Sequence, residues 1–213
     1  MSVFAGEFYG ATSFDDVMQQ FVLIRGIERI MATKQGDFTT VWHWIMEGPM
    51  KAAMQGPLYS LPHSAKCAPA LEKYFDGLRA MVLARCTGSE QTGPCFNAIR
   101  SLQKIYQAVT SVPEHVPKEV GMAWAWVTMV TQDFVELLQA RHPVALVILL
   151  HFATLFVLFE DKWYVKSWSE RSSSAIREQL PAEFWPEENL PGEAQTKQVS
   201  HSYFEKIPFK SRE

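Results

Sequence analysis

Hydrophobic positions recur at helical spacing in several separate segments of this chain. Apolar residues three or four positions apart mark the inward face of a helix. Clusters of Gly, Pro, Ser and Thr between such segments are typical of loops and turns. The pattern predicts amphipathic helices at residues 13–34, 39–47, 68–85, 96–109, 134–138 and 168–180. It predicts loops or turns at residues 56–63, 87–94 and 113–117.

Two further segments are apolar on almost every face, and periodicity alone does not assign them. Residues 122–130 read MAWAWVTMV, which suits either a strand or a buried helix. The helical patterns on both sides favour the helix. Residues 144–159 form the longer apolar run and follow Pro143, a residue that suits the first turn of a helix.

The longer run belongs inside a helical bundle or inside a membrane, because no face of it is polar. Its sixteen residues would extend about 24 Å as a helix, short of the ~30 Å hydrocarbon core of a bilayer. His151 lies in the middle of the run, where a bilayer would make it costly. We therefore expect a buried central helix and no membrane span, with a membrane anchor as the alternative.

Together these segments predict an all-α fold, a single irregular bundle of about seven helices around residues 144–159. With 213 residues, of which 47% are hydrophobic, the chain can bury a sizeable core in one domain. We expect that domain to cover residues 1–186. Residues 187–213 are polar and are expected to be a mobile tail.

Charge and cysteine content exclude several classes of function. The net charge is −3, and the basic residues are spread along the chain, so we expect no direct contact with nucleic acid. Cys67, Cys86 and Cys95 are too few and too far apart for a zinc cluster. Three scattered thiols are typical of a reducing compartment.

No constellation typical of an enzyme occurs in the sequence. The six histidines lie in different segments, without metal-ligand spacing, and neither a nucleophile elbow nor a phosphate-binding glycine loop is found. We expect no catalytic residues, no metal site, no cofactor and no enzymatic activity.

An ordered set of residues in the second half of the chain carries a family resemblance. A short aliphatic turn precedes an Arg-x-Pro-x-Ala-Leu motif, an apolar helix with an internal histidine, and a turn with two tryptophans. The residues are Phe134, Leu137, Leu138, Arg141, Pro143, Ala145, Leu146, His151, Trp163 and Trp168. Together with residues 21–58, they resemble the C-terminal regulatory domain of fungal zinc-cluster transcription factors, of the sterol uptake control protein type. The likeness covers most of residues 13–186.

The resemblance implies a regulatory module of transcription in a fungal nucleus. Such a module would act through ligand binding, or through homo- or heterodimerisation with related factors. That family carries a six-cysteine DNA-binding module, which is missing from this sequence. We therefore expect either a relative without the DNA-binding module or a fragment of a longer factor. A stand-alone small-molecule binding protein with no transcriptional role is the alternative.

The sterol-type members bind a sterol in this domain, so the resemblance implies a lipid or sterol-like ligand. The candidate ligand-binding residues are His151, Phe152 and Phe156 in the apolar run. A few polar groups in a greasy cavity usually orient a ligand, which is the role expected of His151. The simpler interpretation is a core histidine hydrogen-bonded to a backbone carbonyl or to a tryptophan.

Overall fold

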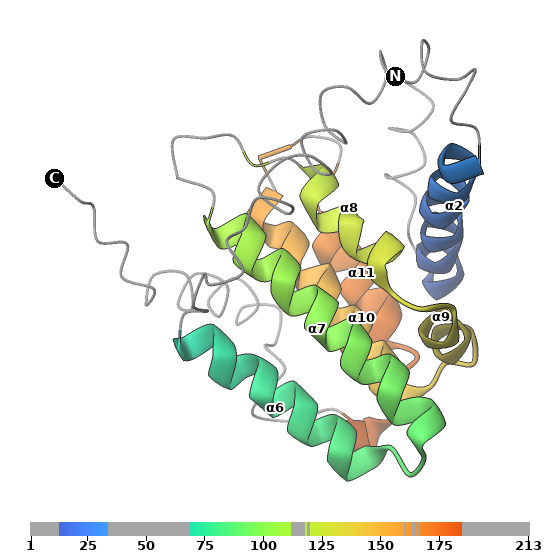
Figure 1. The fold of residues 1–213 in the computed structure, drawn as a ribbon, viewed down its shortest axis with the longest axis vertical. Helices are drawn as coiled ribbons and strands as arrows, with labels where there is room; N and C mark the ends of the chain where they lie inside the picture. The colour runs from blue at the N-terminus through green and yellow to red at the C-terminus, as the bar shows by residue number, and fades with distance from the viewer. Residues whose placement is uncertain are drawn as a thin grey trace, which may run out of the picture.

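The computed structural model describes residues 13–33, 69–111, 120–159 and 167–184, together with Lys118, Asp161, Lys162 and Val165. This part of the chain contains seven α-helices and no strand, which confirms the all-α fold (Figure 1). The α-helices are α2 (Phe14–Thr33), α6 (Pro69–Arg85), α7 (Ser89–Ser111), α8 (Val120–Met129), α9 (Gln132–Gln139), α10 (Pro143–Leu155) and α11 (Trp168–Arg177). Two 3-10 turns follow α10 and α11, namely η1 (Phe156–Phe159) and η2 (Ala182–Phe184).

Helix α10 is the buried centre of the bundle, as expected from its sequence. Residues 144–153 and Leu155 are all buried, and α6, α7, α9 and α11 pack around them. In Figure 1, α6 and α7 lie side by side on one side of α10, and α2 packs against α8 and α11. Pro143 is the first helical residue, after the N-cap His142. The apolar run is not one helix of sixteen residues, because it tightens into the 3-10 turn η1 at Phe156.

Polar contacts fix the start of α2 and join the helix to α8. Its N-terminus has a capping box, in which the Asp16 N–H donates to Ser13 Oγ and the Ser13 N–H donates to Asp16 Oδ2. Further along, Arg25 Nη1 donates to the carbonyl oxygens of Val127 and Val130, at 3.1 and 2.7 Å. These carbonyls lie at the C-terminus of α8, where no N–H group of the same helix can pair with them. Arg25 therefore caps α8 from α2.

The turn expected at residues 87–94 is wrong, because α7 already begins at Ser89. The N–H groups of Gln91 and Thr92 both donate to the Gly88 carbonyl, which starts the helix. The residues of this first turn are polar and are exposed or partly exposed, so they need no apolar periodicity. Pro94 lies inside the helix rather than after a loop. Only residues 86–88 connect α6 to α7.

The ambiguous residues 122–130 lie in and directly after helix α8, as expected.

Within the described ranges, no single helix combines the length and apolar character that a membrane crossing requires. Helix α9 and residues 143–159 meet that requirement only as a pair, and they are bent by 104° at their junction. The expected helix at 39–47, the loop at 56–63, Trp163 and the tail at 187–213 lie outside the described residues.

Candidate functional site

His151 is a polar side chain in the middle of the apolar helix α10. Only 8% of its surface is exposed. Its Nδ1 atom is hydrogen-bonded to the hydroxyl of Tyr74 in α6, and the two rings meet edge to face with centroids 5.3 Å apart. Burial lowers the pKa of the imidazole from 6.5 to about 4. At neutral pH the ring is therefore uncharged and pairs with Tyr74 through a neutral hydrogen bond.

Two more hydroxyl groups converge on the backbone carbonyl of the same residue. Tyr106 in α7 donates to the His151 carbonyl oxygen at 2.9 Å, and Thr154 Oγ1 donates to it at 2.8 Å. The two hydroxyl oxygens are 3.1 Å apart. Hydroxyls that back-bond to a helical carbonyl compete with the regular ladder. This competition coincides with the change from α10 to η1.

We name Tyr74, Tyr106, His151 and Thr154 the His151 cluster. Burial raises the pKa of the Tyr106 hydroxyl to about 12, and hydrogen bonds with Thr154 and Tyr74 act against that shift. Tyr106 therefore stays a protonated donor near neutral pH. The cluster combines hydroxyl groups with an uncharged imidazole in an apolar interior, and such groups suit the recognition of a ligand hydroxyl.

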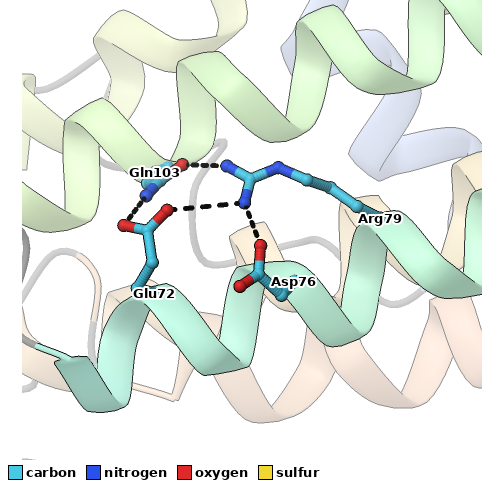
Figure 2. A network of polar contacts seen from close by, with 4 residues as sticks. All are labelled: Glu72, Asp76, Arg79 and Gln103. Atoms are coloured by element: carbon cyan, nitrogen blue, oxygen red, sulfur yellow. Dashed lines mark hydrogen bonds and ion pairs between the residues drawn. The ribbon is translucent and has the colours of Figure 1, made fainter.

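A polar network between α6 and α7 joins the two helices that carry these tyrosines. Arg79 makes an ion pair with Asp76 at 2.6 Å and lies 3.7 Å from Glu72 (Figure 2). Gln103 in α7 donates to Glu72 at 3.0 Å and accepts from Arg79. Gln103 is buried although its partners lie nearer the surface. The network therefore sets the register of α6 against α7, and with it the positions of Tyr74 and Tyr106.

Phe152 and Phe156 belong to a second group of side chains, the aromatic cluster. Phe152 stacks on Trp126 with ring centroids 4.5 Å apart. Phe156 lies 4.6 Å from Trp124 and 4.3 Å from Trp168, measured between ring centroids. These tryptophans come from α8 and α11. Both phenylalanines are fully buried.

The three candidate residues from the sequence therefore divide between two sides of α10. Phe152 and Phe156 contact each other at 5.2 Å between centroids. His151 meets α6 and α7 instead, because consecutive residues of a helix point about 100° apart. Their shared role in ligand binding stays a prediction. His151 does have the hydrogen-bond partner expected of a core histidine, but that partner is a tyrosine hydroxyl rather than a carbonyl or a tryptophan.

Sequence reasoning missed the partners of His151. Tyr74 and Tyr106 lie on the inner faces of amphipathic helices and read there as core residues. A hydroxyl carried into an apolar interior needs a partner, and so does an imidazole. The need of both groups for hydrogen-bond partners was the signal available in the sequence. This signal did not show which groups pair with each other, since Tyr74 and His151 are 77 residues apart.

Three other buried polar atoms in the described part of the chain lie outside the His151 cluster. Nδ1 of His142 and the hydroxyls of Ser172 and Ser173 have no hydrogen-bond partner. Among the described residues, no group of three or more His, Cys, Asp or Glu side chains is arranged to hold a metal ion. Comparisons of this chain with protein-family models, with curated proteins and with solved structures found no match.

Proposed function

We propose that this chain is a regulatory module of a fungal transcription factor. It acts in the nucleus through binding of a lipid or sterol-like ligand, or through dimerisation with related factors, and it does not itself contact DNA. The proposal rests on the family resemblance of residues 134–168 and on one structural observation. That observation is the His151 cluster, a set of hydroxyl and imidazole groups centred on the apolar helix α10.

The chemistry of the cluster suits a ligand with one hydroxyl on a large apolar body. Hydrogen bonds from three helical side chains converge on His151, and apart from His151 and Thr154 the residues of α10 are apolar. Ligand sites of this kind combine an apolar lining with a few polar groups that fix orientation. Tyr74 and Tyr106 come from different helices, so a ligand that exchanged hydrogen bonds with them would change the packing of α6 and α7 on α10. Such a change is a physical route from ligand occupancy to a regulatory response.

The test is a reporter experiment in a yeast cell. The full chain is fused to an unrelated DNA-binding domain, and transcription from its cognate promoter is measured at low and high sterol supply. We expect output that differs from the DNA-binding domain alone and that changes with sterol supply. The fusion could also differ in output from the DNA-binding domain alone without responding to sterol. That result fits the dimerisation mode only if the chain also self-associates or associates with related factors in solution.

The control is a near-isosteric substitution of one residue in the His151 cluster. Tyr106→Phe removes a hydroxyl but keeps the ring, so it should weaken the sterol response while the fusion remains folded. Output equal to that of the DNA-binding domain alone, under every sterol condition and with a folded fusion, would contradict the proposal. If the purified chain then still bound a sterol, the stand-alone binding protein would be favoured.

A further inference from the structure

Helix α11 contributes its first residue, Trp168, to the aromatic cluster. The Trp168 ring lies 4.3 Å from Phe156 and 5.0 Å from Trp124, measured between ring centroids. It also meets Phe152 edge to face at 6.2 Å. Trp168 is itself buried, so its ring separates this side of the cluster from solvent. A movement of α11 away from α10 would therefore take that cover off three aromatic rings.

Most of the inward face of α11 is made of small side chains. The buried residues of this helix are Trp168, Ser169, Ser172, Ser173, Ala175 and Ile176. Hydrophobic stabilisation grows with the apolar area that is buried, and serine and alanine bury little of it. Although α11 packs along α10, its apolar attachment therefore depends on the two large side chains, Trp168 and Ile176.

Two of the buried serines oppose the docking of α11. Ser172 is 0% exposed and Ser173 is 4% exposed, and neither hydroxyl has a hydrogen-bond partner in the protein. A hydroxyl that leaves water without gaining a partner loses free energy on burial. Both hydroxyls would bond to water again if α11 left α10. The docked position of the helix is therefore penalised twice relative to an undocked one.

The backbone is strained at the start of α11. The N-cap residue Ser167 has φ 63° and ψ 6°, in the left-handed region that costs energy for residues with a Cβ atom. Its side chain makes no capping hydrogen bond. Residues at the ends of elements are the ones that absorb backbone rotation when a segment swings. Ser167 is therefore placed to act as a hinge.

We propose that α11 is a lid, which turns about Ser167, leaves α10 as one unit and uncovers the aromatic cluster. The open form is a minor part of the native population, and the rest of the bundle stays folded in it. Helices α7 and α10, by contrast, bury large apolar side chains along their length, among them Leu102, Ile105 and Leu149. These two helices should open only when the whole bundle unfolds.

The lid also gives a route to the candidate residues Phe152 and Phe156 for an apolar ligand. This consequence rests on the proposed function, whereas the movement of α11 does not. The experiment below needs no ligand. Its failure would remove the lid and leave the proposed function to its own test.

Native-state hydrogen exchange of the full chain tests the lid. The amides of α11 should share one opening free energy that is lower than that of α10, so they should exchange at least about tenfold faster after correction for intrinsic rates. Their exchange should depend only weakly on denaturant, because the lid exposes less surface than global unfolding does. Equal protection and equal denaturant dependence in α11 and α10 would overturn the proposal.

Serine variants test whether the buried hydroxyls favour the open form. Ser172→Ala combined with Ser173→Ala removes both hydroxyls with little change in volume, and should slow exchange of the α11 amides at least about thirtyfold. Ser174 lies on the same helix but is exposed, so Ser174→Ala should slow exchange by less than about threefold. This control measures helix propensity at one site. A slowing in the double variant no larger than the square of the control factor would overturn the proposal.

Discussion

Tyr74 and His151 are 77 residues apart in sequence, and their polar atoms are hydrogen-bonded in the interior of the bundle. Tyr106 binds the carbonyl of the same histidine from a third helix. Through these bonds α6 and α7 are joined to the middle of α10 by polar contacts as well as by apolar packing.

Stability should fall in mild acid because of His151. Burial lowers the pKa of this ring from 6.5 to about 4, so the unfolded chain binds a proton in that window and the folded chain does not. The contribution of the neutral ring to the free energy of unfolding is fully present above pH 6.5 and is lost as pH falls towards 4. The total loss is about 3 kcal/mol, at ~1.4 kcal/mol per pH unit. Urea unfolding of wild type and His151→Gln at several pH values checks this. Glutamine can keep a hydrogen bond to Tyr74 but does not titrate, so the stability of His151→Gln should depend less on pH. Identical pH profiles for the two proteins would contradict the assignment of this acid sensitivity to His151.

The two tyrosines of the His151 cluster should differ in their energetic weight. Tyr74→Phe removes the partner of His151 Nδ1 and should reduce the free energy of unfolding by about 1–3 kcal/mol. Tyr106→Phe should cost only about 1 kcal/mol, because Thr154 still donates to the His151 carbonyl. Denaturant titration measures both values. A larger loss for Tyr106→Phe than for Tyr74→Phe would reverse the order that the hydrogen bonds require.

Charge at the centre of α10 should destroy the fold. Leu149 is fully buried, so Leu149→Asp introduces a carboxylate without a partner, which is among the costliest single substitutions. We expect loss of the cooperative unfolding transition seen by circular dichroism. Leu83 offers a matched control, since it lies on α6 with 68% of its surface exposed. Leu83→Asp should unfold at nearly the wild-type temperature, and equal damage from both variants would contradict the buried position of α10.

A buried hydrogen bond between α2 and α11 should contribute measurably to stability. Trp168 Nε1 donates to Gln20 Oε1 at 2.9 Å, and both side chains are buried. Gln20→Leu leaves the indole N–H unpaired and should cost about 1–3 kcal/mol. The neighbouring Gln19 is exposed, so Gln19→Leu should change stability by less than about 0.5 kcal/mol. Equal effects of the two substitutions would mean that the indole is not held by Gln20.

The architecture was predictable where apolar periodicity was strong. The apolar residues of 144–159 identified the central helix, and helical spacing located α2, α6, α9 and α11. The start of α7 was not predictable from that signal. Its first turn is mostly polar and solvent-exposed, so Ser89 and its neighbours resemble a loop in sequence. Pro94 strengthened that wrong impression, because a proline inside a helix removes one backbone hydrogen bond and usually marks a helix boundary.

The candidate site was predictable only in part. An isolated histidine in an apolar run identified His151, and the run itself supplied Phe152 and Phe156. The side chains that contact them come from α6, α7, α8 and α11, and these contacts are set by tertiary packing. Helix spacing alone does not show which side of α10 packs against which of those helices. For this reason the sequence grouped three residues that the structure divides between the His151 cluster and the aromatic cluster.

The most direct test of the proposed role is the melting temperature of the full chain with and without ergosterol, in wild type and in His151→Leu. A ligand that binds only the folded state raises stability by about 2.7 kcal/mol at a hundredfold excess over Kd, which corresponds to roughly 5–10 °C for a chain of this size. We predict that shift in wild type and a smaller one in His151→Leu, each measured against the same protein without sterol. No shift with ergosterol or any related lipid, or equal shifts in the two proteins, would contradict a ligand site at His151.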